Sequence, residues 1–252
     1  MATQQQPTGR EQADDRTERP AVAEPLLLAD LAALRAGAYR SASEAFRYPD
    51  RNRIQWLATA SHELAQEQTT IAHLASSVSW QRLIDALHQL ARCPLADLQE
   101  RYVALFMVGD SDVLCPPYES VYKEPHGRPS GWLLARVEGA YRAAALSPPA
   151  GQGELPDHLA IELEFIALLA ARESDAWQDD DAAAALGAQK QQSVFLRNHV
   201  VAWLPALVQE LAKADHTGAY AAVAREVATF VEYDRDLLEL LESCAESAIS
   251  AT

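Results

Sequence analysis

The chain has little glycine and no apolar run as long as a membrane span. Glycine occurs 10 times in 252 residues, roughly half its usual share, while alanine and leucine are abundant. Because Ala and Leu lose little on entering a helix, this composition favours helices over strands. Residues 1–24 mix acids with bases and have no apolar segment of the kind found in secretory signals. We therefore expect an all-α protein that begins with a disordered tail at residues 1–24.

The chain has few cysteines, and its acidic residues outnumber its basic residues. Cys93, Cys115 and Cys244 lie far apart and form no C-x-x-C pair, which argues against a disulfide framework or a zinc knuckle. This usage fits a reducing cytoplasm. The formal charge of −15 argues against nucleic acid as the main partner. It suits a basic peptide partner, although a generically acidic soluble protein would carry the same charge.

Apolar residues repeat with helical periodicity along most of the chain and predict about eight or nine helices and no strand. We expect one helical-bundle domain at residues 25–246 and a C-terminal tail at 247–252. Two helical halves are expected to join at a proline-rich hinge near 147–156. Residues 173–181 contain five acids and no base, which predicts a solvated turn. The apolar stretch 189–215 predicts one long helix that kinks near Pro205.

Motifs for most catalytic chemistries are absent. Neither G-x-x-x-x-G-K nor G-x-G-x-x-G occurs, so no phosphate-binding loop is expected, and "DDDAA" lacks the last aspartate of D-D-x-x-D. His158 and Glu162 would share a helix face, but no E-x-x-H motif accompanies them. We predict no catalytic residue, no metal ligand and no cofactor. A helical metal-dependent or acid–base enzyme using His158 with Asp157 or Glu162 stays open as an alternative.

A recognition surface is the function that these motifs favour. The segment "CPPYESVY" places Tyr118 and Tyr122 beside prolines in a long irregular stretch, residues 108–131, and Trp132 follows it. Exposed aromatic rings next to rigid prolines make contacts with peptides at low entropic cost. Alternatively, these rings pack the loop onto the bundle.

The chain resembles a known family in three motifs. These are "PPYESVY", then "ELPDHLAIELEFIALL" about thirty residues later, then "FLRNHVVAWLPALVQELAKAD". In order and spacing, residues 26–242 resemble the TorD/DmsD/NarJ family of redox-enzyme maturation chaperones. The resemblance implies an all-helical cytoplasmic chaperone, not an enzyme, that assists cofactor insertion into a molybdenum-containing oxidoreductase. Such a chaperone binds the twin-arginine signal peptide or the apo-form of the catalytic subunit.

The resemblance also implies a binding site and an assembly state. The segment with Tyr118 would line a peptide groove, and the segment with Asp157 would face it as an acidic counterpart. We expect Asp157 to serve the positive end of its helix together with the ligand, and His158 to set the hydrogen bonding beside it. A monomer or a domain-swapped dimer is expected, with no nucleic acid partner and no stable membrane insertion. Clients of the dimethyl-sulfoxide-reductase, chlorate, selenate and hydrocarbon dehydrogenase types all fit. A structural assembly factor that does not bind the signal peptide (the leader) of the catalytic subunit stays open as another alternative. The predicted client-binding residues are Tyr118, Glu119, Ser120, Tyr122, Trp132, Glu154, Asp157, His158 and Glu162.

Overall fold

The computed structural model describes residues 25–71, 77–107, 113–124, 131–146, 153–215 and 218–250, and these ranges are helical without a β-sheet. The predicted tail at 1–24 and most of the predicted hinge at 147–156 lie outside the described residues. The helices are α1 Pro25–Ala45, α2 Arg51–Ile71, α3 Ser77–Ala91, α4 Leu95–Tyr102, α5 Glu119–Lys123, α6 Gly131–Ala143, α7 Leu159–Gln178, α8 Ala182–Asn198, α9 Val200–Ala214 and α10 Ala219–Ser250. A five-residue π-helix, Val103–Met107, continues α4.

The all-α prediction is confirmed, and two helix boundaries differ from those expected. The stretch 189–215 is divided between α8 and α9 at His199, and Pro205 lies inside α9. His199 has φ −120° and ψ −85°, which ends the regular helical backbone at that residue. The last helix runs to Ser250, which extends into the predicted C-terminal tail.

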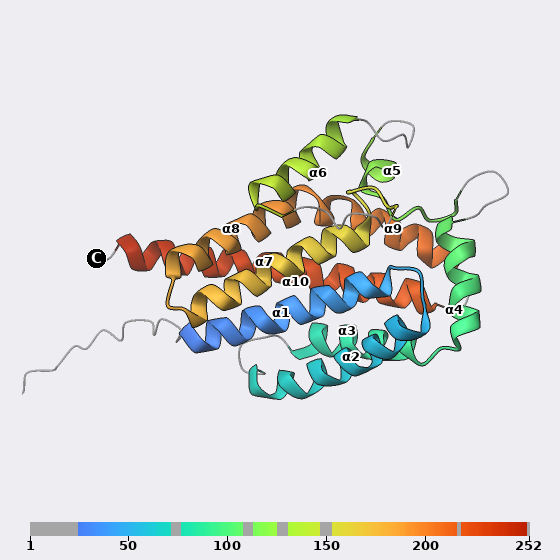
Figure 1. Cartoon of the computed structure of the whole chain (residues 1–252), viewed down its shortest axis with the longest axis horizontal. Coiled ribbons are helices and arrows are strands. Elements are labelled where there is room, and N and C mark those ends of the chain that lie inside the picture. The colour runs from blue at the N-terminus through green and yellow to red at the C-terminus, as the bar shows by residue number, and fades with distance from the viewer. Residues whose placement is uncertain are drawn as a thin grey trace, which may run out of the picture.

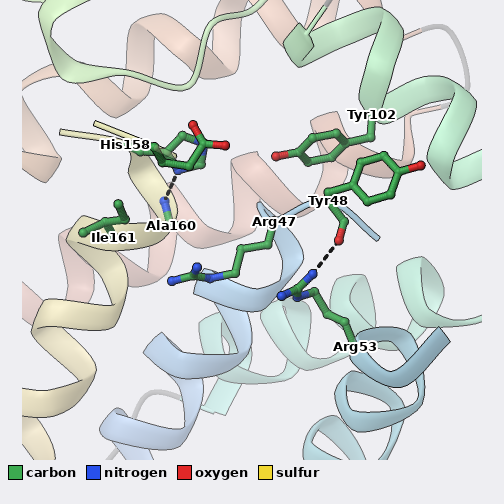
Figure 2. A pocket seen from close by; sticks show the side chains of 8 residues that line it. Arg47, Tyr48, Arg53, Tyr102, His158, Ala160 and Ile161 are labelled. Carbon is green, nitrogen blue, oxygen red and sulfur yellow. Dashed lines mark hydrogen bonds between the residues drawn. The ribbon is translucent and has the colours of Figure 1, made fainter. Parts of the chain in front are cut away.

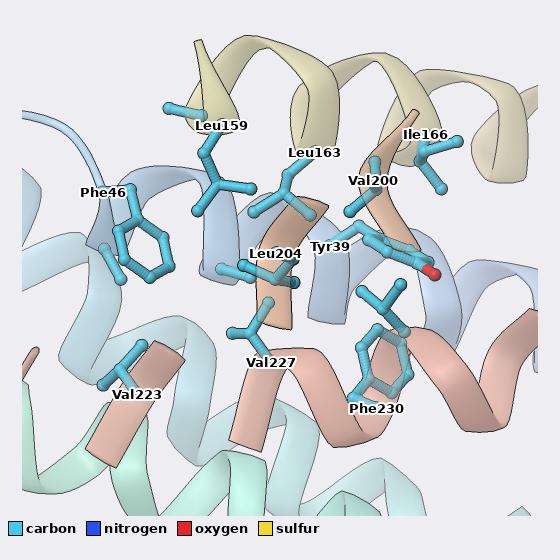
Figure 3. Packing of buried hydrophobic residues seen from close by; sticks show 14 of the residues in the cluster. Tyr39, Phe46, Leu159, Leu163, Ile166, Val200, Leu204, Val223, Val227 and Phe230 are labelled. Atoms are coloured by element: carbon cyan, nitrogen blue, oxygen red, sulfur yellow. The ribbon is translucent and has the colours of Figure 1, made fainter. Parts of the chain in front are cut away.

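α7 lies at the centre of the bundle, where it packs against α1 and α8 (Figure 1). Its sequence is apolar on two faces, as a helix covered on both sides requires. Figure 3 shows Leu159, Leu163 and Ile166 of α7 in a core that also receives Tyr39 from α1 and Phe230 from α10. α10 packs against α3, α8 and α9, while α2 closes the bundle over α1 and α3. Among the described helices, none is long and apolar enough to cross a bilayer.

A buried charge network ties four helices together. The guanidinium of Arg35 on α1 donates to Asp234 Oδ1 on α10 at 2.5 Å and to Glu173 Oε2 on α7 at 2.7 Å. It also donates to Gln192 Oε1 on α8 at 2.6 Å. The prediction of a solvated turn at 173–181 is therefore wrong at its start. α7 continues to Gln178, and the Glu173 carboxylate is buried because Arg35 pairs with it.

Candidate functional site

Two distant segments of the chain meet at the N-terminus of α7. The amide of Glu119 donates to the carbonyl of Asp157 at 3.0 Å, and the amide of Leu159 donates to the carbonyl of Pro117 at 2.8 Å. Tyr118 and His158 thereby form an isolated antiparallel bridge. This pairing brings together the two parts of the predicted site, which are about forty residues apart in sequence. We call this contact between residues 117–120 and 157–159 the joint between α5 and α7.

The Asp157 side chain, which lies just before α7, forms its hydrogen bond with α5. Its side chain is fully buried, and Oδ2 accepts a hydrogen bond from the amide of Ser120 at 3.0 Å. Burial raises the pKa of Asp157, and the hydrogen bonds from Ser120 oppose this shift. The hydrogen bond of this carboxylate goes to the first turn of α5, and the side chain that accepts from the first turn of α7 is that of His158.

His158 is the N-cap of α7. Its Nδ1 accepts a hydrogen bond from the amide of Ala160 at 3.1 Å, which satisfies one of the free amides of the first turn. The Tyr118 ring meets the imidazole edge to face, with 5.0 Å between ring centroids. Burial lowers the pKa of His158 to about 4, although the Glu154 carboxylate opposes this effect. The side chain is consequently neutral at pH 7, as an acceptor at a helix N-terminus must be.

Of the nine predicted site residues, four reach the surface. Glu154 and Trp132 are exposed, and Tyr118 and Tyr122 are half-buried. The Tyr118 hydroxyl donates to the Glu154 carboxylate, and the Tyr122 ring stacks on Trp203 with 5.5 Å between centroids. The other five, Glu119, Ser120, Asp157, His158 and Glu162, are buried.

A cavity of about 230 Å³ opens beside this joint (Figure 2). Six of the eight lining residues were not predicted. Arg47 and Tyr48 come from the segment after α1, Arg53 from α2, Tyr102 from α4, and Ala160 and Ile161 from α7. The other two are Glu154 and His158. The stretch "FRYPDR" at 46–51 mixes aromatic and charged residues around a proline, and this was the available signal.

Both arginines of the cavity are paired with acids. Arg47 Nη2 donates to Glu164 Oε2 at 2.6 Å, and Arg53 Nε donates to Glu44 Oε2 at 2.5 Å. The volume is below the roughly 300–1,000 Å³ of small-molecule pockets. The cavity therefore suits one or two side chains of a peptide better than a cofactor.

A second polar group lies beneath α5. Glu119 Oε2 accepts from His199 Nδ1 at 2.8 Å, and Glu119 Oε1 accepts from Lys123 Nζ at 2.9 Å. Glu162 Oε2 accepts from Trp203 Nε1 at 3.0 Å. Burial raises the pKa of Glu162 strongly, and the nearby Glu119 carboxylate adds to this shift. Within the described residues, Glu119, Glu162 and His199 are the group whose donor atoms could share a metal ion. His158 is not part of it.

Comparison with known proteins identifies the family. The family model described as nitrate reductase delta subunit matches residues 72–209. The chaperone protein TorD of Vibrio cholerae is 31% identical over 188 residues, which cover 72% of this chain and 83% of that protein. The perchlorate reductase assembly chaperone protein of Dechloromonas aromatica is 30% identical over 149 residues, covering 59% and 64% of the two chains. The chain therefore belongs to the nitrate reductase delta subunit family, the TorD/NarJ group of maturation chaperones.

Proposed function

We propose that this protein is a cytoplasmic chaperone for the catalytic subunit of a molybdenum-containing oxidoreductase. It binds the twin-arginine signal peptide of that subunit, or its apo-form, while the cofactor is inserted. Membership of a family whose similar relatives are named chaperones and assembly proteins supports the general role. The observation that carries the leader-binding role is the joint between α5 and α7, which sets an exposed acid beside a cavity sized for one or two side chains of a peptide.

Glu154 is the proposed acceptor for a leader arginine. Its carboxylate is exposed and, among the described residues, accepts one side-chain hydrogen bond, from Tyr118, which leaves acceptor capacity for a guanidinium fork. Trp132, which is 66% exposed on α6, offers an aromatic surface to the apolar part of the leader. The net charge of −15 attracts a cationic peptide at long range.

The five buried residues of the site are proposed to position the exposed residues and not to contact the leader directly. Asp157 fixes the first turn of α5 and His158 fixes that of α7, so together they set where Tyr118 and Glu154 lie. Replacing a buried member should therefore lower stability and affinity together. Replacing Glu154 should lower affinity alone.

The test is a double-mutant cycle between Glu154→Gln and the leader peptide. The full-length chain is titrated with the leader of a candidate client and with leaders in which each arginine is replaced by glutamine. A charge-assisted hydrogen bond is worth about 1.5–3 kcal/mol, so Glu154→Gln should weaken wild-type leader binding roughly tenfold or more. One of the arginine replacements should show coupling with Glu154, because the two changes remove the same contact.

Two controls make the cycle decisive. Glu239→Gln removes an exposed acid on α10, which pairs with Arg197 at 3.9 Å, and should leave the affinity unchanged at fixed ionic strength. A catalytic subunit without its leader tests the alternative of an assembly factor that ignores the leader. Equal binding of the leaderless and complete subunits, with no binding of the isolated leader, would support that alternative and refute ours.

The oligomeric state is a separate part of the proposal. A hinge near 147–156 would let helical halves exchange between protomers, giving a monomer and a domain-swapped dimer. Size-exclusion chromatography after refolding at low and high protein concentration should resolve both species. A single monomer peak under every refolding condition would contradict the exchange.

A further inference from the structure

Three buried side chains from three helices converge beneath the client-binding joint. Glu119 comes from α5, Glu162 from α7 and His199 from the junction of α8 and α9. Each offers one ligand atom, and these atoms all lie within 4.8 Å of one another. Sequence reasoning gave no sign of this group, because its members are far apart in the chain and form no metal-binding motif.

One atom of this group has no partner. Glu162 is fully buried, and within the described residues no donor group reaches its Oε1, while the neighbouring Glu119 carboxyl lies within hydrogen-bond reach of the Glu162 side chain. Leaving a buried carboxylate oxygen without a donor or a cation is costly. Trp203 Nε1 donates to the other oxygen, Glu162 Oε2. Oε1 is therefore available to bind a cation.

The carboxyl groups near Glu162 share few basic partners. Glu119, Asp157 and Glu162 are all buried, and among the described residues Lys123 and His199 pair with Glu119. Lys123 Nζ contacts Glu119 Oε1 and the carbonyl of Asn198, and it does not reach Glu162. A divalent ion bound by Glu119 and Glu162 would keep both carboxyl groups ionised, and its charge would balance their two negative charges.

We propose that Glu119, Glu162 and His199 bind a single zinc-type divalent ion, which ties α5 to α7 and α9. Imidazole and carboxylate donors suit Zn²⁺, whereas Mg²⁺ and Ca²⁺ prefer oxygen ligands. Three protein ligands leave one position of a tetrahedral ion for water. Lys123 and Trp203 orient the two carboxylates through the oxygens that would not bind the ion.

The movement required of Glu119 and His199 is small. Two donors about 2.1 Å from one tetrahedral ion lie roughly 3.4 Å apart. Glu119 Oε2 and His199 Nδ1 are now 2.8 Å apart, so they would separate by about half an ångström. His199 would then carry its proton on Nε2, and Nδ1 would bind the ion in place of its contact with Glu119.

The test uses the full-length chain after chelator treatment and dialysis, titrated with ZnCl₂ against a competing chromophoric chelator. We expect one tightly bound equivalent and a rise in Tm of about 5–10 °C at a hundredfold excess over Kd. Glu162→Gln and His199→Gln should each weaken zinc binding at least tenfold. X-ray absorption should show nitrogen and oxygen ligands at about 2.0–2.1 Å. Millimolar MgCl₂ should not compete.

A matched control removes surface binding from consideration. The His62 and His88 rings lie 6.4 Å apart between centroids and could bind zinc adventitiously. His88→Gln should leave the tight equivalent intact. Loss of that equivalent in His88→Gln, or its survival in Glu162→Gln, would refute the site. If no tight equivalent is found, a proton shared between Glu119 and Glu162 is the occupant and the proposal is wrong. Because the readout is zinc itself, this outcome is independent of leader binding.

Discussion

His158 should make the free energy of unfolding decrease as pH falls, and the substitution His158→Asn should remove this dependence. The imidazole has a pKa of about 4 in the folded chain and 6.5 as its ordinary value, because burial disfavours its charged form. Below pH 6.5 the unfolded chain binds a proton that the folded chain does not. Stability from this residue is therefore complete above pH 6.5 and is lost as pH falls toward 4.

The magnitude follows from these two pKa values. Between pH 7.5 and pH 5 the linkage relation gives a loss of about 2 kcal/mol from His158 alone. His158→Asn is the suitable perturbation, because the Asn carbonyl can still accept from the Ala160 amide as an N-cap. Its smaller volume should lower stability by an amount that does not depend on pH. The pH-dependent part is then attributable to the imidazole.

The assay is urea unfolding of wild type and His158→Asn at several pH values from 5 to 7.5, with a chelator present. Raised pKa values at Asp157 and Glu162 contribute equally to both proteins and cancel in the difference. The advantage of wild type over His158→Asn should shrink by about 2 kcal/mol across this range. A difference that stays constant within about 0.5 kcal/mol would refute the buried neutral imidazole.

Two further predictions concern the core and the thiols. Arg35→Met leaves the carboxylates of Asp234 and Glu173 buried without their cation, so urea unfolding should show a loss of about 3–5 kcal/mol. Adding Asp234→Leu and Glu173→Met should recover most of that loss, and no recovery would show that the charges are not the cause. Burial raises the pKa of Cys115 to about 11, so native protein at pH 8 should react with Ellman's reagent at exposed Cys244 and not at Cys115. Equal reaction rates for these two thiols would contradict the burial of Cys115.

The helical fold could be predicted from the sequence because its causes are local. Apolar periodicity and the abundance of Ala and Leu act within one turn or two, and the two apolar faces of α7 suit its position between α1 and α8. The acidic stretch at 173–181 was misread for the opposite reason. Glu173 is neutralised by Arg35, which lies 138 residues away in sequence, and no local pattern reveals that pairing.

The candidate site was likewise predictable in its local sequence motifs and not in its tertiary contacts. Sequence motifs identified both segments that meet at the joint, and the structure brings them into contact. The motifs did not reveal which side chains face solvent, because burial depends on the helices packed above them. Nor did they reveal Arg47 and Tyr102, which reach the cavity from the segment after α1 and from α4 through tertiary packing alone.

The adjacent Asp157 and His158 have separate structural tasks, and this explains why both are needed. His158 turns back to its own helix and caps α7, whereas Asp157 reaches across to the amide of Ser120 and fixes α5. Each of these side chains accepts from the amide of a different helix, so the two contacts use both residues. The pair therefore holds the first turns of α5 and α7 beside the hydrogen bond that Tyr118 makes with Glu154 at the surface. Because the two residues are buried, a client would sense them through the position of this surface and not through direct contact.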